Sequence, residues 1–106
     1  MRYTSKKQAK NGVLRHAKQR TEQRYGFTLE KHILDECLKK IKYGQNVLLL
    51  EHQSRTRKRF LIRLNSGVVV HAIYSSTFKS LVTVLELEWI PSNLQGQASE
   101  WINGEI

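Results

Sequence analysis

Three residues near the start of the chain have the types and the spacing that phosphate chemistry uses. His16, Arg20 and Arg24 lie four residues apart, so on a helix they form one strip along one face. A histidine among cations has its protonated form disfavoured, so its imidazole can be neutral near pH 7 and act as a general base. An arginine one turn away offers a planar fork that binds phosphate. A solvated helix face has the same pattern, and the spacing alone fits both interpretations.

A second basic cluster lies between two segments of strand-like sequence. The stretch HQSRTRKRF, residues 52–60, carries four cations in five positions. A charged hairpin protects a sheet edge from aggregation, but this density exceeds that need. We therefore expect phosphate contact, which positions a nucleic acid without reading its sequence. Over the whole chain, the expected nucleic-acid contacts are Arg15, Lys18, Arg24, Arg55, Arg57, Lys58, Arg59, Arg63 and Lys79.

Two further candidates lie on the last two segments of strand-like sequence. His71 stands among valines, and Thr83 interrupts the apolar stretch SLVTVLEL. Each also has an ordinary explanation, because such a histidine is commonly hydrogen-bonded and partly buried, and threonine is a good β former. The sequence contains no HExxH motif, no glycine-rich phosphate loop and no metal-ligand cluster. The basic half also has too few acids for two-metal nuclease chemistry, so we expect neither a metal nor a cofactor.

The elements that must position these residues follow from the periodicity of the sequence. Residues 1–12 are an expected basic arm, and residues 13–44 have the spacing of two helices. Residues 46–87 change to period two and predict four strands, NVLLLEH, RKRFLIRL, VVVHAIY and SLVTVLEL, while residues 88–106 form a tail. The expected class is α+β: two N-terminal helices packed on one face of a four-stranded antiparallel meander, with a short C-terminal tail, in a single domain of residues 1–106.

The loop NSG at residues 65–67 determines which side chains share a face of this sheet. With Gly67 in the left-handed conformation of a three-residue loop, Leu64 pairs with Val68. A two-residue turn would exchange the faces of one strand. The first register gives an apolar face under the helices, made of Phe60, Ile62, Leu64, Val68, Val70, Ala72 and Tyr74. The other face then carries Arg59, Leu61, Arg63, Val69, His71 and Ile73.

The charge of the chain is confined to one part of the sequence. Residues 1–63 hold 17 of the 18 Lys and Arg residues and five of the nine acids, a net charge of +12, whereas residues 64–106 carry −3. Such clustering favours a nucleic acid over an anionic lipid, and solubility alone is the remaining explanation. One cysteine, Cys37, and the lack of a long apolar run lead us to expect a cytoplasmic protein with no membrane partner.

The order of these motifs resembles small phage and toxin nucleases of the barnase, EndoU, colicin D and RelE-like superfamily. The likeness rests on RHAKQRTEQRYGFTL, on a second helix that ends at a glycine, and on RFLIRLNSGVVVHAIYSSTFKSLVTVL, and it covers residues 13–87. It implies RNA cleavage without metal, in which the ribose 2′-OH attacks the adjacent phosphate and leaves a cyclic phosphate and a 5′-OH. Such chemistry needs a base, cations for the phosphorane and an acid.

Carried over to this chain, the resemblance implies a role for each of several residues. His16 would act as base or acid, Arg20 as phosphate clamp and Thr83 as a hydrogen-bonding group. Tyr74 would fit the aromatic end of a strand, and Arg57 or Arg59 would stabilise the phosphorane. No glutamate stands where the secreted ribonucleases carry their base, so His71 is a rival to His16.

Three functions are compatible with this sequence. The leading hypothesis is a metal-independent endoribonuclease of phage or toxin type that cleaves tRNA or ribosome-bound message, with a neutralising immunity or antitoxin protein as a further expected partner. The second is a non-catalytic protein that uses the same basic surface to bind RNA, DNA or a host enzyme. The third is an antitoxin or a structural phage protein, supported only by the small size.

Overall fold

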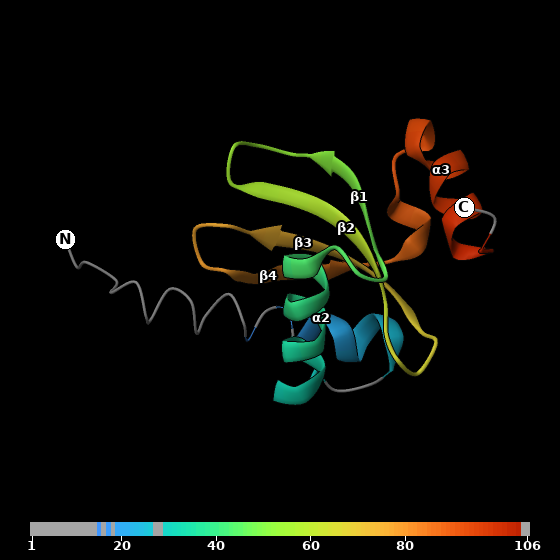
Figure 1. Cartoon of the computed structure of the whole chain (residues 1–106). Coiled ribbons are helices and arrows are strands. Elements are labelled where there is room, and N and C mark those ends of the chain that lie inside the picture. The colour runs from blue at the N-terminus through green and yellow to red at the C-terminus, as the bar shows by residue number, and fades with distance from the viewer. Residues whose placement is uncertain (1–14, 16, 18, 27–28, 105–106) are drawn as a thin grey trace.

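The computed structural model describes residues 15, 17, 19–26 and 29–104, and Figure 1 shows their arrangement. Four strands, β1 (Val47–His52), β2 (Arg57–Arg63), β3 (Val69–Ser75) and β4 (Ser80–Leu85), pair antiparallel in chain order. Residues 15, 17 and 19–25 belong to an N-terminal helix, which is followed along the chain by α2 (Lys31–Tyr43), a short 3-10 helix η1 (Leu87–Trp89) and α3 (Ser92–Ile102). The predicted α+β class and antiparallel meander are confirmed.

The register of the central hairpin follows from its three-residue loop. Gly67 has a φ of 95°, a conformation that glycine adopts without strain, and the Leu64 N–H donates to the Val68 carbonyl oxygen over 2.8 Å. Ile62 then lies opposite Val70, and the pairing continues without a shift to the far end of the hairpin. The predicted register and the resulting faces of β2 and β3 are confirmed.

Two apolar clusters lie on opposite faces of the sheet. Ile62 belongs to a cluster that includes Leu34 and Cys37 of α2, whereas its neighbour Leu61 belongs to a cluster that includes Ala98 of α3. Consecutive residues of a strand point to opposite faces, so α2 and α3 contact different sides of the sheet. All five of these side chains are buried. The described residues therefore form one core on each side of the four-stranded sheet.

The prediction of a C-terminal tail is wrong, because Ser92–Ile102 forms the helix α3. The helix follows Pro91 and directs Leu94, Ala98, Trp101 and Ile102 toward the sheet. Their spacing of three and four residues is that of one helical stripe. The many polar residues between them obscure this stripe in the sequence.

A lysine ties the end of α2 to the central hairpin. Lys40 is buried, and its Nζ donates to Glu36 Oε2 and to the Arg63 carbonyl oxygen, each over 2.6 Å, and to Asn65 Oδ1 over 3.1 Å. Burial alone would raise the pKa of Glu36, but the hydrogen bonds from Lys40 and from the Asn65 N–H bring it below its ordinary value. The helix then ends at Gly44, which is left-handed with a φ of 67°. In the described part of the chain, no helix is both long and apolar enough to cross a bilayer.

Candidate nucleic-acid interface

The β1–β2 and β3–β4 hairpins end side by side, at the left of Figure 1. The Ser76 N–H donates to the Thr56 carbonyl oxygen over 2.8 Å, and the Ser76 hydroxyl donates to the same oxygen over 3.2 Å. This contact holds the two tips together although they are 20 residues apart in the sequence. The basic residues at this end of the sheet are Arg55, Arg57, Lys58 and Lys79, here called the hairpin-end surface. Arg57 and Lys58 are consecutive in β2 and so extend from opposite faces of the sheet at the same end.

The hairpin-end surface presents its positive charge to solvent. Arg55, Arg57 and Lys79 are exposed and Lys58 is half-buried, and among the described residues none of the four side chains has a hydrogen bond or an ion pair. The loop that carries the first two is ordered locally, because Ser54 Oγ accepts the Arg57 N–H over 3.2 Å. Four unpaired cations on a fixed backbone can bind the phosphates of a polyanion.

Arg59 follows these residues in β2 but belongs to a buried network. Its Nε donates to Glu51 Oε1 over 2.7 Å, and its Nη1 lies 2.8 Å from His71 Nε2. Glu51 is brought opposite Arg59 by a bulge in β1 after Leu49. The guanidinium group is thus occupied within the protein, which differs from the expectation that Arg59 contacts phosphate.

His71 is fully buried and both of its ring nitrogens are engaged. Nδ1 lies 2.9 Å from the Glu86 carbonyl oxygen, which can only accept, so the proton is on Nδ1 and Nε2 accepts from Arg59. Burial lowers the pKa of His71; the hydrogen bond to the Glu86 carbonyl oxygen opposes this shift, and the positive charge of Arg59 adds to it. The imidazole has no free lone pair for a substrate, so its environment is that of a structural histidine.

Tyr25 connects the same network to the N-terminal helix. Its hydroxyl donates to the Leu85 carbonyl oxygen over 2.6 Å and accepts the His71 N–H over 3.0 Å. Burial raises the pKa of this phenol above its ordinary value. The end of the N-terminal helix is therefore fixed at the end of β4.

Arg24 and Arg63 also use their guanidinium groups inside the protein. Arg24 donates to the Val84 carbonyl oxygen, and its Nε lies 3.9 Å from Glu86 Oε1. Arg63 donates to the carbonyl oxygens of Trp101 and Ile102 over 2.8 and 2.9 Å, where a cation is favoured at the end of α3. Like Arg59, both differ from the expected phosphate contacts.

The remaining expected site residues are distributed over several surfaces. Arg15 is exposed, and Arg20 is partly exposed with Nη1 donating to Gln23 Oε1 over 3.2 Å. Thr83 lies opposite Ile73 and so on the face of His71. Tyr74 lies on the other face, where its ring meets that of Phe60 edge-on at 6.3 Å. His16 and Lys18 lie outside the described residues.

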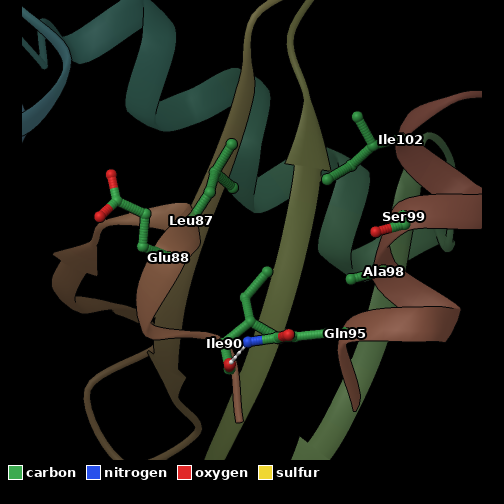
Figure 2. Close-up of a pocket in the computed structure, with 7 residues that line it drawn as sticks. All are labelled: Leu87, Glu88, Ile90, Gln95, Ala98, Ser99 and Ile102. Carbon is green, nitrogen blue, oxygen red and sulfur yellow. Dashed lines mark hydrogen bonds between the residues drawn. The ribbon is translucent and has the colours of Figure 1, made fainter. Parts of the chain in front are cut away.

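A pocket of about 330 Å³ lies between η1 and α3 and is shown in Figure 2. Four of its lining residues are apolar, namely Leu87, Ile90, Ala98 and Ile102, and the Gln95 amide donates to the Ile90 carbonyl oxygen over 3.1 Å. Glu88 is the only titratable side chain among its described lining residues, which are Leu87, Glu88, Ile90, Gln95, Ala98, Ser99 and Ile102. Among the described residues there is also no group of three His, Cys, Asp or Glu side chains that could hold a metal ion.

Two features of this arrangement could not be predicted from the sequence. The partner of Arg59, Glu51, is placed by a bulge, and a bulge leaves no clear pattern in one sequence. Trp89 falls in the expected tail, whereas in the structure it is the last residue of η1, four residues after the end of the edge strand β4, and its ring faces Arg24. An aromatic residue two positions after the expected strand SLVTVLEL is the signal that could have indicated this contact. Comparison with protein-family models, with curated protein sequences and with solved structures found no match.

Proposed function

We propose that this chain binds nucleic acid, with RNA as the partner, through the hairpin-end surface. The observation that carries the proposal is the contrast between two kinds of basic residue. Arg24, Arg59 and Arg63 are engaged inside the protein, whereas Arg55, Arg57 and the other members of the hairpin-end surface have no partner among the described residues. Unpaired surface cations gain free energy from phosphates because each contact releases condensed counterions.

The backbone of Lys79 supports the same proposal. Its φ is 51°, in the left-handed region that costs a side chain about 1 kcal/mol and that glycine adopts freely. A lysine at this position therefore places a positive charge at the tip of the β3–β4 hairpin at the expense of some stability. This cost is consistent with a role for the charge in binding.

The proposal includes the placement of the two N-terminal helices on the face opposite α3. Ala17 of the N-terminal helix and Leu34 of α2 both belong to the apolar cluster of Ile62 and Val84, which supports this placement. Helices in that position leave the hairpin tips free to meet a ligand. The sheet then acts as a rigid support for the two loops.

The test is the affinity of the purified chain for a fluorescein-labelled 20-nucleotide RNA, measured by anisotropy at 0.1 M salt. The variant Arg55→Gln/Arg57→Gln/Lys79→Gln should bind about 100-fold more weakly. Each phosphate contact to a single strand contributes about 0.7 log unit of affinity per decade of salt below 1 M, so the loss of three contacts at 0.1 M costs about two log units. The control Lys31→Gln/Lys39→Gln/Lys42→Gln removes the same charge from exposed positions of α2 and should change the affinity by less than about threefold. Equal losses in both variants would contradict a localised site.

RNA cleavage is the second candidate, and it rests on the resemblance and on the spacing of His16 and Arg20. His71 offers no free ring nitrogen, so His16 is the base or acid that we propose for a nuclease. Incubation of the pure protein with total RNA and ribosomes in EDTA, followed by analysis of the ends, separates the two functions. Cyclic phosphate ends that disappear in His16→Ala would support the enzyme, and a neutralising immunity or antitoxin protein would then be expected. Intact RNA would leave the binding function alone.

A further inference from the structure

Trp89, the last residue of η1, has an exposed aromatic side chain. It is 56% exposed, and the Arg24 guanidinium carbon lies 4.8 Å from the centre of its ring. The side chain of Arg24 is only 10% exposed, so the ring lies over the guanidinium as its outer layer. A ring that is covered on one face and half exposed overall has its other face open to solvent.

This ring is held in a fixed orientation before any ligand arrives. Arg24 is bound to the Val84 carbonyl oxygen and paired with Glu86, so the cation beneath the ring cannot move freely. The backbone of Trp89 is fixed as well, because its N–H donates to the Glu86 carbonyl oxygen over 3.1 Å. A rigid aromatic face loses little conformational entropy when a second ring stacks on it.

The charges around Trp89 favour an uncharged ring over a phosphate. The Glu86 carboxylate is paired with Arg24, but Glu88, the residue before Trp89, is exposed and its charge would repel a nearby phosphate. Arg20 lies one helical turn before Arg24 and is partly exposed, so it offers a cation on the same side of the N-terminal helix as the arginine beneath the ring. An uncharged base can stack on the ring without repulsion from Glu88, while the phosphate backbone of the same nucleotide runs past the cation of Arg20.

We propose that Trp89 is a stacking site for an unpaired base, so that the nucleic acid bound by this chain is single-stranded. The inference rests on the proposed function and specifies its ligand. Bases within a duplex are already stacked on their neighbours, and only an unpaired base can place its face on a protein ring. Stacking of this kind is tolerant of sequence, as is phosphate contact at the hairpin-end surface.

The length of β4 determines the ligand for the test. Lys79 precedes this six-residue strand and Trp89 follows it in η1, so the two sites are separated by about 20 Å at 3.3 Å per residue. A stacked single strand covers that distance in about six nucleotides. A 12-nucleotide RNA without self-complementarity is therefore long enough to reach both sites.

The experiment follows Trp89 fluorescence in the Trp101→Phe variant, in which Trp89 is the sole tryptophan of the chain. The 12-nucleotide RNA should quench it in a saturable way, with the midpoint that anisotropy gives for binding. The same RNA annealed to its complement should leave it nearly unchanged. In the full chain, Trp89→Leu should weaken binding of the single strand about 5- to 150-fold, the range of one base–aromatic stack, while Trp89→Phe retains affinity within about threefold.

The possible outcomes separate this inference from the proposed function. Single-strand binding by anisotropy without quenching of Trp89, and with unchanged affinity in Trp89→Leu, would overturn the stacking site and leave the proposed function standing. Equal quenching by the single strand and the duplex would overturn the assignment of an unpaired base. Absence of any binding would overturn the proposed function itself. If Trp89→Leu fails to fold, the quenching experiment still decides the matter, because position 89 is unchanged in it.

Discussion

The substitution Arg59→Met, compared with Arg57→Met, tests the division of the basic residues into structural and binding groups. The two arginines lie two residues apart in β2. Arg59 joins Glu51 to His71, whereas the Arg57 side chain has no partner among the described residues. Methionine retains the apolar stem of arginine, so each substitution removes mainly the guanidinium group.

The expected loss of stability follows from what Arg59 leaves behind. His71 is fully buried, and its Nε2 would lose its donor, at a cost of about 1–3 kcal/mol. The side chain of Glu51 is 35% exposed and can be hydrated, so its lost partner adds only about 1 kcal/mol or less. Arg59→Met should therefore lower the free energy of unfolding by about 2–3 kcal/mol. Arg57→Met should change it by less than about 0.5 kcal/mol, as is usual for an exposed side chain.

Urea denaturation, monitored by circular dichroism, measures these free energies, and RNA anisotropy measures binding below the unfolding transition. Arg57→Met should weaken RNA binding about fivefold at 0.1 M salt, the effect of one phosphate contact. Arg59→Met should bind RNA as the original chain does while it remains folded. The reasoning would be refuted if Arg59→Met retained full stability and lost RNA affinity.

Three further predictions concern the buried groups. Burial and Arg59 keep the pKa of His71 below 6.5, so the unfolded chain takes up this proton first as the pH falls. The contribution of His71 to the free energy of unfolding should therefore be constant above pH 6.5. Below pH 6.5 it should decrease by up to about 1.4 kcal/mol per pH unit. Urea titrations from pH 8 to 5 should show this slope weakened in His71→Asn and kept in the control His52→Asn. Burial raises the pKa of the Cys37 thiol to about 12, so a disulfide reagent at pH 8 should react with it only at the rate of unfolding, and rapid labelling of the native chain would contradict its burial. Arg63→Met should accelerate amide hydrogen exchange at the end of α3 about tenfold without affecting α2, because two charged hydrogen bonds to the last carbonyl groups are lost. Equal exchange rates in the variant and in the original chain would show that these bonds contribute nothing to the stability of α3.

The strands and their faces could be predicted because they depend on local pattern. Period-two alternation indicates β1 to β4, and Gly67 in the loop NSG determines that Phe60, Ile62 and Ala72 share a face. The helix α3 could not be predicted, because polar residues interrupt its apolar stripe. The stripe is recognisable only once it is seen to pack against Leu61 of the sheet. Local pattern identifies an element best when its neighbours in sequence, and not in space, determine its environment.

The surroundings of the basic residues could be predicted only in part. The sequence indicates the cations of HQSRTRKRF, but it does not distinguish Arg57, which faces solvent, from Arg59, which is buried. That distinction depends on the bulge that places Glu51 opposite Arg59 and on the position of His71 across the hairpin. Likewise, the sequence does not indicate that Arg24 contacts the Val84 carbonyl oxygen and the Trp89 ring. Long-range contacts decide whether a cation binds a ligand or holds the fold together.

The salt dependence of RNA affinity tests the central claim most directly. Between 50 and 300 mM salt, the logarithm of the association constant should fall with a slope of about −3, as expected for four phosphate contacts to a single strand. The variant Arg55→Gln/Arg57→Gln/Lys79→Gln should reduce the magnitude of this slope by about 2, and Lys31→Gln/Lys39→Gln/Lys42→Gln should leave it unchanged. An unchanged slope in the first variant, or an equal reduction in both, would contradict phosphate binding at the paired hairpin tips.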